Sequence, residues 1–403
     1  MRKETKVKFN GYMTRLGEIY GVQPQEFTDS KVEIEPSAAQ KLESKIQLSA
    51  VFLTKINIVP VKDQVGEKIG IGIGSTVAGT TDTTKQDREP TDPTQLAKQG
   101  YHCRQTNFDT AIRYEKLDMW AMFEDFQRRI RDAIIQRQAL DRIMIGFNGT
   151  SRAATSDRKV NKLLQDVNVG WLHKIRLEAP DHVLGSSTDK DTNKITPEPI
   201  KVGKGEDYEN LDALVMQAVD HAISEVYADD TDLVVICGRS LLADKYFPIV
   251  NRDQANTEAL AADVIISQKR LGGLPAVRVP YFPKNGMLIT RLDNLSIYWQ
   301  IESRRRQVVD NAKRDRIENY ESVNEDYIIE DYDCVALIEN IELTKGKQEP
   351  DAPTGDDAEQ KAKMLATLEE NEALKAELDA LKKGDGQPKN AEPEKTGKEN
   401  KVA

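Results

Sequence analysis

Residues 238–283 read GRSLLADKYFPIVNRDQANTEALAADVIISQKRLGGLPAVRVPYFP and directly follow a short apolar run, LVVIC, at residues 233–237. Such a run has the length and composition of a buried strand, and helical spacing begins at residues 241–246. Helix and strand patterns continue to alternate through residues 264–267, 276–279, 288–290 and 295–299. The pattern predicts a compact α/β domain over residues 205–300, and no known enzyme motif matches it.

Four other extended stretches accompany this block in a fixed order along the chain. They are MRKETKVKFNGYMTRLGEIYGV at residues 1–22, INIVPVKDQVGEKIGIGIGSTVAGTTDT at 56–83, FEDFQRRIRDAIIQRQALDRIMIGFNG at 123–149 and RIENYESVNEDYIIEDY at 316–332. Together they resemble the major capsid proteins of tailed phages of the peduovirus, or P-two-like, group. The resemblance covers roughly residues 1–343 and rests on long runs rather than on short patterns. It implies an α+β chain with the Hong Kong 97 type phage capsid fold.

The resemblance also assigns a part of that fold to each stretch of the chain. We expect a scaffold-like segment that maturation removes at residues 1–32, an N-terminal arm at 33–60, an extended loop at 61–113, a peripheral domain with a long spine helix at 114–204, an axial domain at 205–300 and a return to the peripheral domain at 301–345. The tail of residues 346–403 lies outside the resemblance.

The function that the resemblance implies needs no catalysis. A major capsid protein self-assembles into hexamers and pentamers, which form the icosahedral shell of a phage head around double-stranded DNA. The implied partners are further copies of the chain, a capsid scaffolding protein with protease activity, the portal protein and, non-specifically, the packaged DNA. The protein would assemble in the host bacterial cytoplasm and reside in the virion capsid. Two alternatives stay open: a cargo-enclosing cellular nanocompartment of the same fold, and an α/β enzyme built on residues 205–300.

The bulk composition agrees with a shell protein. The 403 residues are enough for two or three domains, and the net charge of -10 argues against a protein that grips DNA broadly. Apolar runs reach only about five residues, far fewer than the ~18 that a membrane-spanning helix needs. We therefore expect no membrane partner.

The sequence predicts no catalytic, cofactor-binding or metal site. The histidines have no metal-ligand spacing to one another or to a cysteine pair; they are His102, His173, His182 and His221. The cysteines are odd in number and widely separated, which is typical of reduced structural thiols; they are Cys103, Cys237 and Cys334.

Two charged clusters have structural interpretations as well as functional ones. The carboxylates of Glu330, Asp331 and Asp333 are expected on the solvated face of a strand. The second cluster consists of Arg304, Arg305, Arg306, Arg314 and Arg316. These arginines could grip phosphate on an inner wall, but the rigid donor fork of arginine favours pairing with acidic groups across subunit contacts.

The first segment predicts a short amphipathic helix. Its apolar residues recur at helical spacing, and Gly21 follows as a C-terminal cap; they are Phe9, Tyr12, Met13, Leu16 and Ile19. Two interpretations stay open. The helix packs on its own domain, or it belongs to the scaffold-like segment that a head maturation protease removes, as the family implies. The expected processing region is polar and consists of Thr28, Asp29, Ser30, Lys31, Val32 and Glu33.

An alternation of isoleucine and glycine marks residues 69–74. It places every isoleucine on one face of a strand and leaves the other face bare, which favours a long extended hairpin. A phosphate-binding loop is excluded by spacing, because counting on from Gly72 and Gly74 gives Val77 where the dinucleotide fingerprint requires a third glycine.

Apolar residues at helical spacing from residue 117 to 147 predict one long helix. At ~1.5 Å per residue it would be about 45 Å long, and Gly146 and Gly149 would end it. Two later strands, at residues 327–329 and 335–338, are expected to return and complete the sheet of the peripheral domain.

The tail has no aromatic residue from Gly346 onward and is rich in Pro, Gly, Lys and Glu, so we expect most of it to be disordered. Within it, Met364, Asn371, Leu374, Leu378 and Leu381 fit the a and d positions of a heptad. An asparagine at an a position among leucines is a device that fixes the register of a parallel dimer. A short coiled coil and a lone solvated helix on a flexible tether both fit this pattern.

Overall fold

The computed structural model describes residues 1–73, 78, 80–85, 87–88, 94–121, 125–250 and 269–344. By its contacts the chain separates into two units, Met1–Thr344 and Lys345–Ala403. All described residues belong to the first unit. The candidate coiled coil of the tail, formed by Met364, Asn371, Leu374, Leu378 and Leu381, therefore lies outside the described residues.

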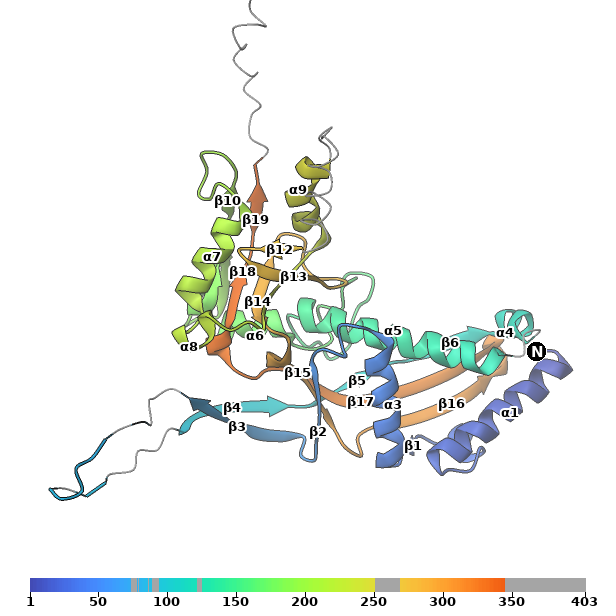
Figure 1. Ribbon diagram of the computed structural model, residues 1–403. Coiled ribbons are helices and arrows are strands. Elements are labelled where there is room, and N and C mark those ends of the chain that lie inside the picture. The colour runs from blue at the N-terminus through green and yellow to red at the C-terminus, as the bar shows by residue number, and fades with distance from the viewer. Residues whose placement is uncertain are drawn as a thin grey trace, which may run out of the picture. The chain divides into compact units, whose positions relative to one another are not determined.

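A mixed sheet of six strands forms the centre of the predicted α/β domain (Figure 1). Its strands are, in order, β12 (Arg270–Leu271), β13 (Leu274–Arg278), β11 (Leu233–Cys237), β14 (Met287–Arg291), β18 (Val335–Ile338) and β7 (Val183–Leu184). β11 pairs with β13 in parallel and with β14 in the antiparallel direction. The LVVIC run is thus a strand at the centre of a sheet, as predicted.

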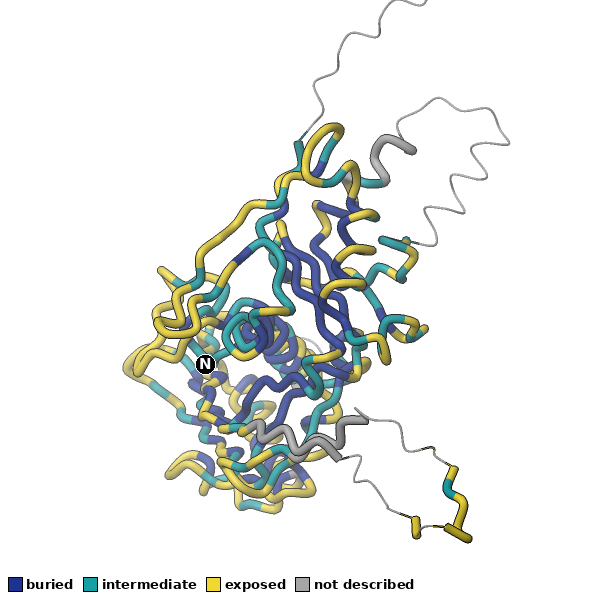
Figure 2. The backbone as a smooth tube through the Cα atoms, turned by 90° about the vertical axis from the view of Figure 1, so that its left-hand side faces the viewer, coloured by how far each residue is buried: buried dark blue, intermediate teal, exposed yellow. Residues whose placement is uncertain are grey.

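The uninterrupted apolar runs of this sheet arise because both of its faces are covered. Val235 of β11 enters one core together with helices α7 (Leu211–Ala222) and α9 (Arg239–Val250). Its neighbour Ile236 enters the other core together with helix α6 (Trp171–Glu178). Figure 2 shows the buried backbone of these central strands between more exposed segments.

A second sheet, of seven strands, lies along the long helix α5 (Phe126–Asn148), as Figure 1 shows. Its order is β1 (Val32–Glu33), β16 (Arg305–Asn311), β17 (Arg316–Ile329), β15 (Leu295–Gln300) and β2 (Asn57–Val61), with β5 (Arg104–Asn107) and β6 (Thr110–Arg113) also paired to β17. Helix α5 contributes Ile143 to the core that contains Ile297 and Tyr327 of this sheet. Helix α5 and the sheet therefore share one apolar core.

Short elements connect these layers. They are α2 (Glu26–Asp29), η1 (Pro180–His182), β8 (Ser186–Asp189), β9 (Lys194–Pro197), β10 (Ile200–Val202), α8 (Glu225–Ala228), η2 (Leu292–Asn294), η3 (Ala312–Arg314), η4 (Tyr332–Cys334) and β19 (Ile341–Leu343). β8 and β9 form a hairpin, and β10 pairs with β19 in parallel. Within the described part of the chain, no helix is long and apolar enough to cross a membrane.

Two strands join different sheets from those that the sequence pattern suggests. The pattern places β15 in the α/β domain, but β15 pairs with β17 and β2. It places β18 beside β17 in the peripheral sheet, but β18 pairs with β14 in the six-stranded sheet. Both expectations were wrong because an apolar run identifies a strand and not its partner. All four residues of β18 are buried, which fits a sheet that is covered on both faces.

The predicted single long helix is also wrong. The structure has α4 (Tyr114–Trp120) and α5, with Ala121 and Asp125 in turns between them. The periodicity hid the break because Leu117 of α4 and Ile130 of α5 are buried in the same core. The 23 residues of α5 make a helix of about 34 Å. Gly146 does not end it but lies inside it, where a Cβ atom would meet the ring of Trp171 at 2.2 Å.

Two predictions for the first hundred residues are confirmed. Helix α1 (Lys3–Tyr20) ends at Gly21, whose positive φ of 68° allows its N–H to bond to the carbonyl of Gly17. Strands β3 (Val65–Ile73) and β4 (Thr94–His102) form the expected antiparallel hairpin, which runs out from the rest of the fold in Figure 1. The isoleucine side chains of the hairpin lie outside the described residues.

Candidate functional site

A group of buried charged side chains joins three elements of the fold. Glu43 lies on α3 (Pro36–Ser49), Arg142 on α5, and Arg304 just before β16. Arg142 donates from Nη1 and Nη2 to the two carboxylate oxygens of Glu43, at 2.5 and 3.0 Å. Arg304 also donates to Glu43. One glutamate therefore holds two buried guanidinium groups and ties α3 to α5.

Strand β17 supplies the other carboxylates of this group. Because side chains alternate along a strand, Glu321 and Glu325 point to the same face. Arg142 Nε donates to Glu325 at 2.9 Å, and Glu321 accepts from the other arginine. Gln138 donates to the second oxygen of Glu321 at 3.0 Å, and the Tyr327 hydroxyl to that of Glu325 at 3.2 Å. We call Glu43, Arg142, Arg304, Glu321 and Glu325 the Glu43 network.

The electrostatics of the Glu43 network follow from burial and pairing. Burial by itself disfavours a charged Glu43, but Arg142 and Arg304 outweigh it and lower the pKa of Glu43 to about 2. Burial raises the pKa of Glu325, an effect that the charge of Arg142 opposes. All five side chains are buried, so this arrangement offers no site for a substrate. It holds α3, α5 and the seven-stranded sheet in one arrangement.

The arginine cluster predicted from the sequence divides into buried and exposed members. Arg306 is buried, and it donates to Asn319 at 2.7 Å and to the hydroxyls of Tyr20 and Tyr12 at 3.1 and 3.3 Å. The expectation of pairing across subunit contacts is therefore wrong for Arg304 and Arg306, which find their partners within the chain. The remaining members are Arg305 and Arg314, which are exposed, and Arg316, which pairs with Glu318 at 2.5 Å.

The N-terminal helix packs on the rest of the described chain. Met13, Leu16 and Tyr20 of α1 are buried against the core that also contains Trp299 and Val308 of the sheet. The hydroxyl groups of Tyr12 and Tyr20 complete the hydrogen bonds of the buried guanidinium of Arg306. Of the two interpretations of this segment, the structure therefore shows the helix packed on its own domain.

The expected processing region lies between two buried residues, Phe27 and Ile34. Thr28 and Asp29 close the short helix α2, and residues 28–31 are exposed. Val32 and Glu33 pair with β16, so the backbone there is held in a sheet. The region consists of Thr28, Asp29, Ser30, Lys31, Val32 and Glu33. Residues 28–31 are its exposed part outside the sheet.

The base of the β3–β4 hairpin is fixed to the sheet by Glu330. This carboxylate pairs with Lys68 of β3 at 2.8 Å and accepts hydrogen bonds from Ser296 at 2.5 Å and Tyr298 at 3.1 Å. Asp331 accepts from the hydroxyl of Tyr227 at 2.8 Å. The expectation of a solvated strand face is therefore wrong for Glu330 and Asp331, because β17 ends before them and both carboxylates have partners.

The cysteines are buried and free of disulfide bonds. Burial raises the pKa of Cys103 to about 12 and those of Cys237 and Cys334 to about 11. Such thiols stay protonated at neutral pH and lack nucleophilic character. Among the described residues, no group of three or more His, Cys, Asp or Glu side chains could hold a metal ion.

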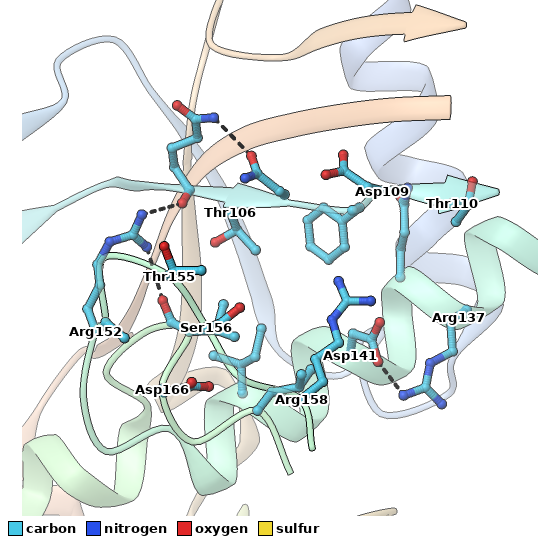
Figure 3. Close-up of a pocket in the computed structure, with 18 of the residues that line it drawn as sticks. Thr106, Asp109, Thr110, Arg137, Asp141, Arg152, Thr155, Ser156, Arg158 and Asp166 are labelled. Atoms are coloured by element: carbon cyan, nitrogen blue, oxygen red, sulfur yellow. Dashed lines mark hydrogen bonds and ion pairs between the residues drawn. The ribbon is translucent and has the colours of Figure 1, made fainter. Parts of the chain in front are cut away.

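A polar cavity of about 570 Å³ opens between β5, β6, helix α5 and the loop of residues 152–167, as Figure 3 shows. Sequence reasoning found neither this cavity nor the Glu43 network. One signal for the network was available, since Gln138 and Arg142 stand at positions i and i+4 on the face of α5 that also carries Ala139 and Ile143. Polar residues within an apolar stripe indicate a buried polar contact.

The sequence of the chain matches a known protein family. The family model described as phage major capsid protein, P2 family, matches residues 8–341. The chain is similar to capsid proteins of Escherichia phage P2, with 56% identity over 344 residues, 85% of this chain and 96% of the relative. It is also similar to the major capsid protein of Serratia phage KSP20, with 39% identity over 348 residues, 85% of this chain and 97% of the relative.

A solved structure of an assembled particle agrees with these matches. A chain of the satellite phage P4 procapsid, which includes size determination (Sid) protein, aligns with a TM-score of 0.69 and 54% identity over 85% of this chain and 99% of that chain. The fold is the Hong Kong 97 type capsid fold, and the resemblance stated from the sequence is confirmed. The protein is a structural component of the virion, a major capsid protein of a tailed-phage head, and not an enzyme. The chain belongs to the P2 family of phage major capsid proteins.

Proposed function

We propose that the subunit assembles into hexamers and pentamers that close an icosahedral head around double-stranded DNA. The observation that carries this proposal is the match to a procapsid chain over 99% of that chain's length, which supports a subunit folded for assembly. The Glu43 network and the shared cores supply a stiff body, and the β3–β4 hairpin supplies a long extension. Interlocking extensions can hold a shell together without catalytic residues.

The parts of the subunit follow from this role. We assign residues 33–60 to an N-terminal arm, 61–113 to the extended loop that overlaps a neighbour, 114–204 and 301–345 to the peripheral domain, and 205–300 to the axial domain around the capsomer centre. β15 pairs with β17 of the seven-stranded sheet, and β18 pairs with β14 of the six-stranded sheet. This supports two regions that the chain crosses between more than once, and not two regions joined by a single flexible linker.

The proposed partners are a capsid scaffolding protein with protease activity and the portal protein, with non-specific contact to packaged DNA. We propose that the protease removes the first segment, residues 1–32, by cutting within Thr28, Asp29, Ser30, Lys31, Val32 and Glu33. Exposure of residues 28–31 supports this site, because a protease needs an accessible stretch of backbone. Intact-mass measurement of mature heads tests it, and retention of Met1 would refute it.

The tail is proposed to act apart from the shell body. The family match ends at residue 341, and the residues beyond it include the heptad positions Met364, Asn371, Leu374, Leu378 and Leu381. Pairing of two tails as a short coiled coil is one role, and a solvated helix on a tether is the other. Sedimentation of the isolated tail peptide over a range of concentrations separates the two.

Expression of the full chain with and without its scaffolding partner tests the assembly proposal. We expect sedimentation and negative-stain electron microscopy to detect closed shells, or discrete hexamers and pentamers. A well-behaved monomer under both conditions would contradict the proposal.

A further inference from the structure

Helix α1 shares a groove with α3 and α5 beside the seven-stranded sheet (Figure 1). The groove has a volume of about 560 Å³, and its lining includes Arg306 of β16 and Glu321 of β17. Both carboxylate oxygens of Glu321 already accept hydrogen bonds, one from Arg304 and one from Gln138. The charge of Arg306 is therefore the one in this part of the groove that needs an explanation.

Arg306 is a buried cation whose hydrogen-bond partners are all neutral. Its side chain is 6% exposed. Nε donates to Asn319, and the two terminal nitrogens donate to the hydroxyls of Tyr20 and Tyr12. Among the described residues, no carboxylate forms an ion pair with Arg306. A guanidinium keeps its charge when buried, so this one lacks the counter-ion that buried charges usually have.

Removal of the first segment would change the surroundings of Arg306. Tyr12 and Tyr20 would leave with α1, and so would Glu18, an acidic residue of the groove lining. Arg306 would keep only Asn319 as a partner and would lie beside the apolar side chains of Val308 and Ile317. Apolar neighbours limit the screening by water, which strengthens the attraction of the guanidinium for an anion.

The helices that remain around the groove supply further cations. Lys41 and Lys45 line it from α3, are exposed, and have no ion-pair partner among the described residues. Arg131 lines it from α5, and its ion pair with Asp132, at 2.8 Å, lies near the surface, where such pairs contribute little. Side chains four positions apart on a helix are neighbours, with Cβ atoms ~5–6 Å apart. Several separate cations along one groove suit a polyanion better than a single carboxylate.

We propose that removal of α1 uncovers a phosphate-binding groove, formed by Arg306, Lys41 and Lys45, that contacts the packaged double-stranded DNA. The inference rests on the proposed processing and on the proposed DNA-enclosing shell. It adds the place of the DNA contact and the reason why the contact forms only after processing. In the full-length chain, the hydroxyls of Tyr12 and Tyr20 accept the hydrogen bonds that phosphate oxygens take in the processed chain.

A cut made after folding tests the uncovering of the groove. The recognition site of a sequence-specific protease is inserted after Ser30 of the full chain, within the exposed residues 28–31. The subunit is cut, passed through a gel-filtration column and titrated into a fluorescently labelled DNA duplex at low salt. The matched control is the same chain left uncut. We expect the cut subunit to bind the duplex at least about tenfold more tightly, because phosphate contacts dominate such binding at low salt.

Substitutions locate the binding in the groove. In the cut subunit, Arg306→Gln should reduce the dependence of log affinity on log salt by about one unit, the value for one phosphate contact. Its control is Arg305→Gln, which changes the exposed neighbour on the other face of β16 and should leave the slope unchanged. Arg306 also supports folding, so Lys45→Glu at an exposed site gives a second test. We expect Lys45→Glu to weaken binding by about tenfold, and its control, Lys55→Glu in the turn after α3, to have no effect.

The outcomes separate this inference from the proposed function. Equal affinities before and after the cut overturn the inference, as does a cut segment that stays on the subunit during gel filtration. Polyglutamate that displaces the duplex as well as unlabelled DNA does would assign the groove to an acidic peptide and overturn the DNA contact. Normal particles together with any of these results leave the shell function standing, whereas failure of the unmodified chain to form particles counts against the shell function itself.

Discussion

The Glu43 network and the cavity beside β5 are both polar regions packed against helix α5. They differ in how fully their buried side-chain oxygen atoms are hydrogen-bonded. Both oxygens of each carboxylate in the network accept a hydrogen bond from within the chain. The one network atom without a partner among the described residues is the nitrogen Arg304 Nε. In the cavity, Thr106 Oγ1 and Asp166 Oδ1 accept none from the described residues. Hydrogen-bonded buried polar groups make a core more rigid, whereas unpaired ones cost free energy. Substitutions in the Glu43 network should accordingly destabilise the folded subunit more than substitutions at the cavity.

The largest expected loss of stability comes from a substitution in the Glu43 network. Glu43→Gln removes the charge that faces Arg142 and Arg304 and leaves two buried cations undercompensated. We expect the unassembled subunit to lose about 3–5 kcal/mol of unfolding free energy, measured by urea denaturation. The matched control is Glu198→Gln, which changes an exposed side chain and should shift the value by less than about 0.5 kcal/mol. Equal losses for both variants would contradict a folding role for the network.

The pH dependence of stability sharpens the same point. The pKa of Glu43 is about 2 in the fold against 4.5 ordinarily, so its contribution is complete above pH 4.5 and is lost as the pH falls towards 2. This shift corresponds to about 3 kcal/mol. The raised pKa of Glu325 acts in the opposite sense. Its largest cause is burial, which the wild type and Glu43→Gln share, and only the smaller effect of the Glu43 charge is lost in the variant. The stability gap between the two proteins should therefore narrow between pH 4.5 and 2, and a constant gap would refute the assignment.

The same contrast explains how much the sequence could predict. Helix α1, the β3–β4 hairpin and the LVVIC strand follow from local periodicity and capping, and all three are confirmed. The sheet memberships of β15 and β18 depend on contacts between distant segments, which a pattern of apolar residues does not encode. The cavity was beyond sequence reasoning for the same reason, since Thr106 and Asp166 of its lining are 60 positions apart and only the folded chain brings them together.

Arg306 has hydrogen-bond partners in two parts of the chain. Asn319 lies in the sheet, whereas Tyr12 and Tyr20 lie in the segment that maturation is proposed to remove. Tyr20→Phe deletes the hydroxyl that accepts from Arg306 Nη1 at 3.1 Å inside a buried site. We expect the full-length subunit to lose about 1.5–3 kcal/mol, measured by urea denaturation, since the bond is to a charged group. The control Tyr281→Phe removes an exposed hydroxyl that lies 3.5 Å from Arg137 and should cost close to nothing. An unchanged stability for Tyr20→Phe would mean that this hydrogen bond contributes nothing to the attachment of α1.

The smallest expected effect on the subunit comes from the anchor of the hairpin. Lys68→Met removes the ion pair with Glu330, whose two side chains are only partly exposed, and we expect a loss of about 1 kcal/mol in unfolding free energy. Hydrogen exchange of β3 and β4 should accelerate far more than that of β11, because the pair holds the base of the hairpin and not the core. The control Lys85→Met breaks the exposed pair with Asp82 and should leave the exchange of both strands unchanged. If hydrogen exchange accelerated equally across the subunit, Lys68 would support the whole fold. The Lys68–Glu330 pair would then be a folding contact like the Glu43 network, and not a contact that only positions the hairpin.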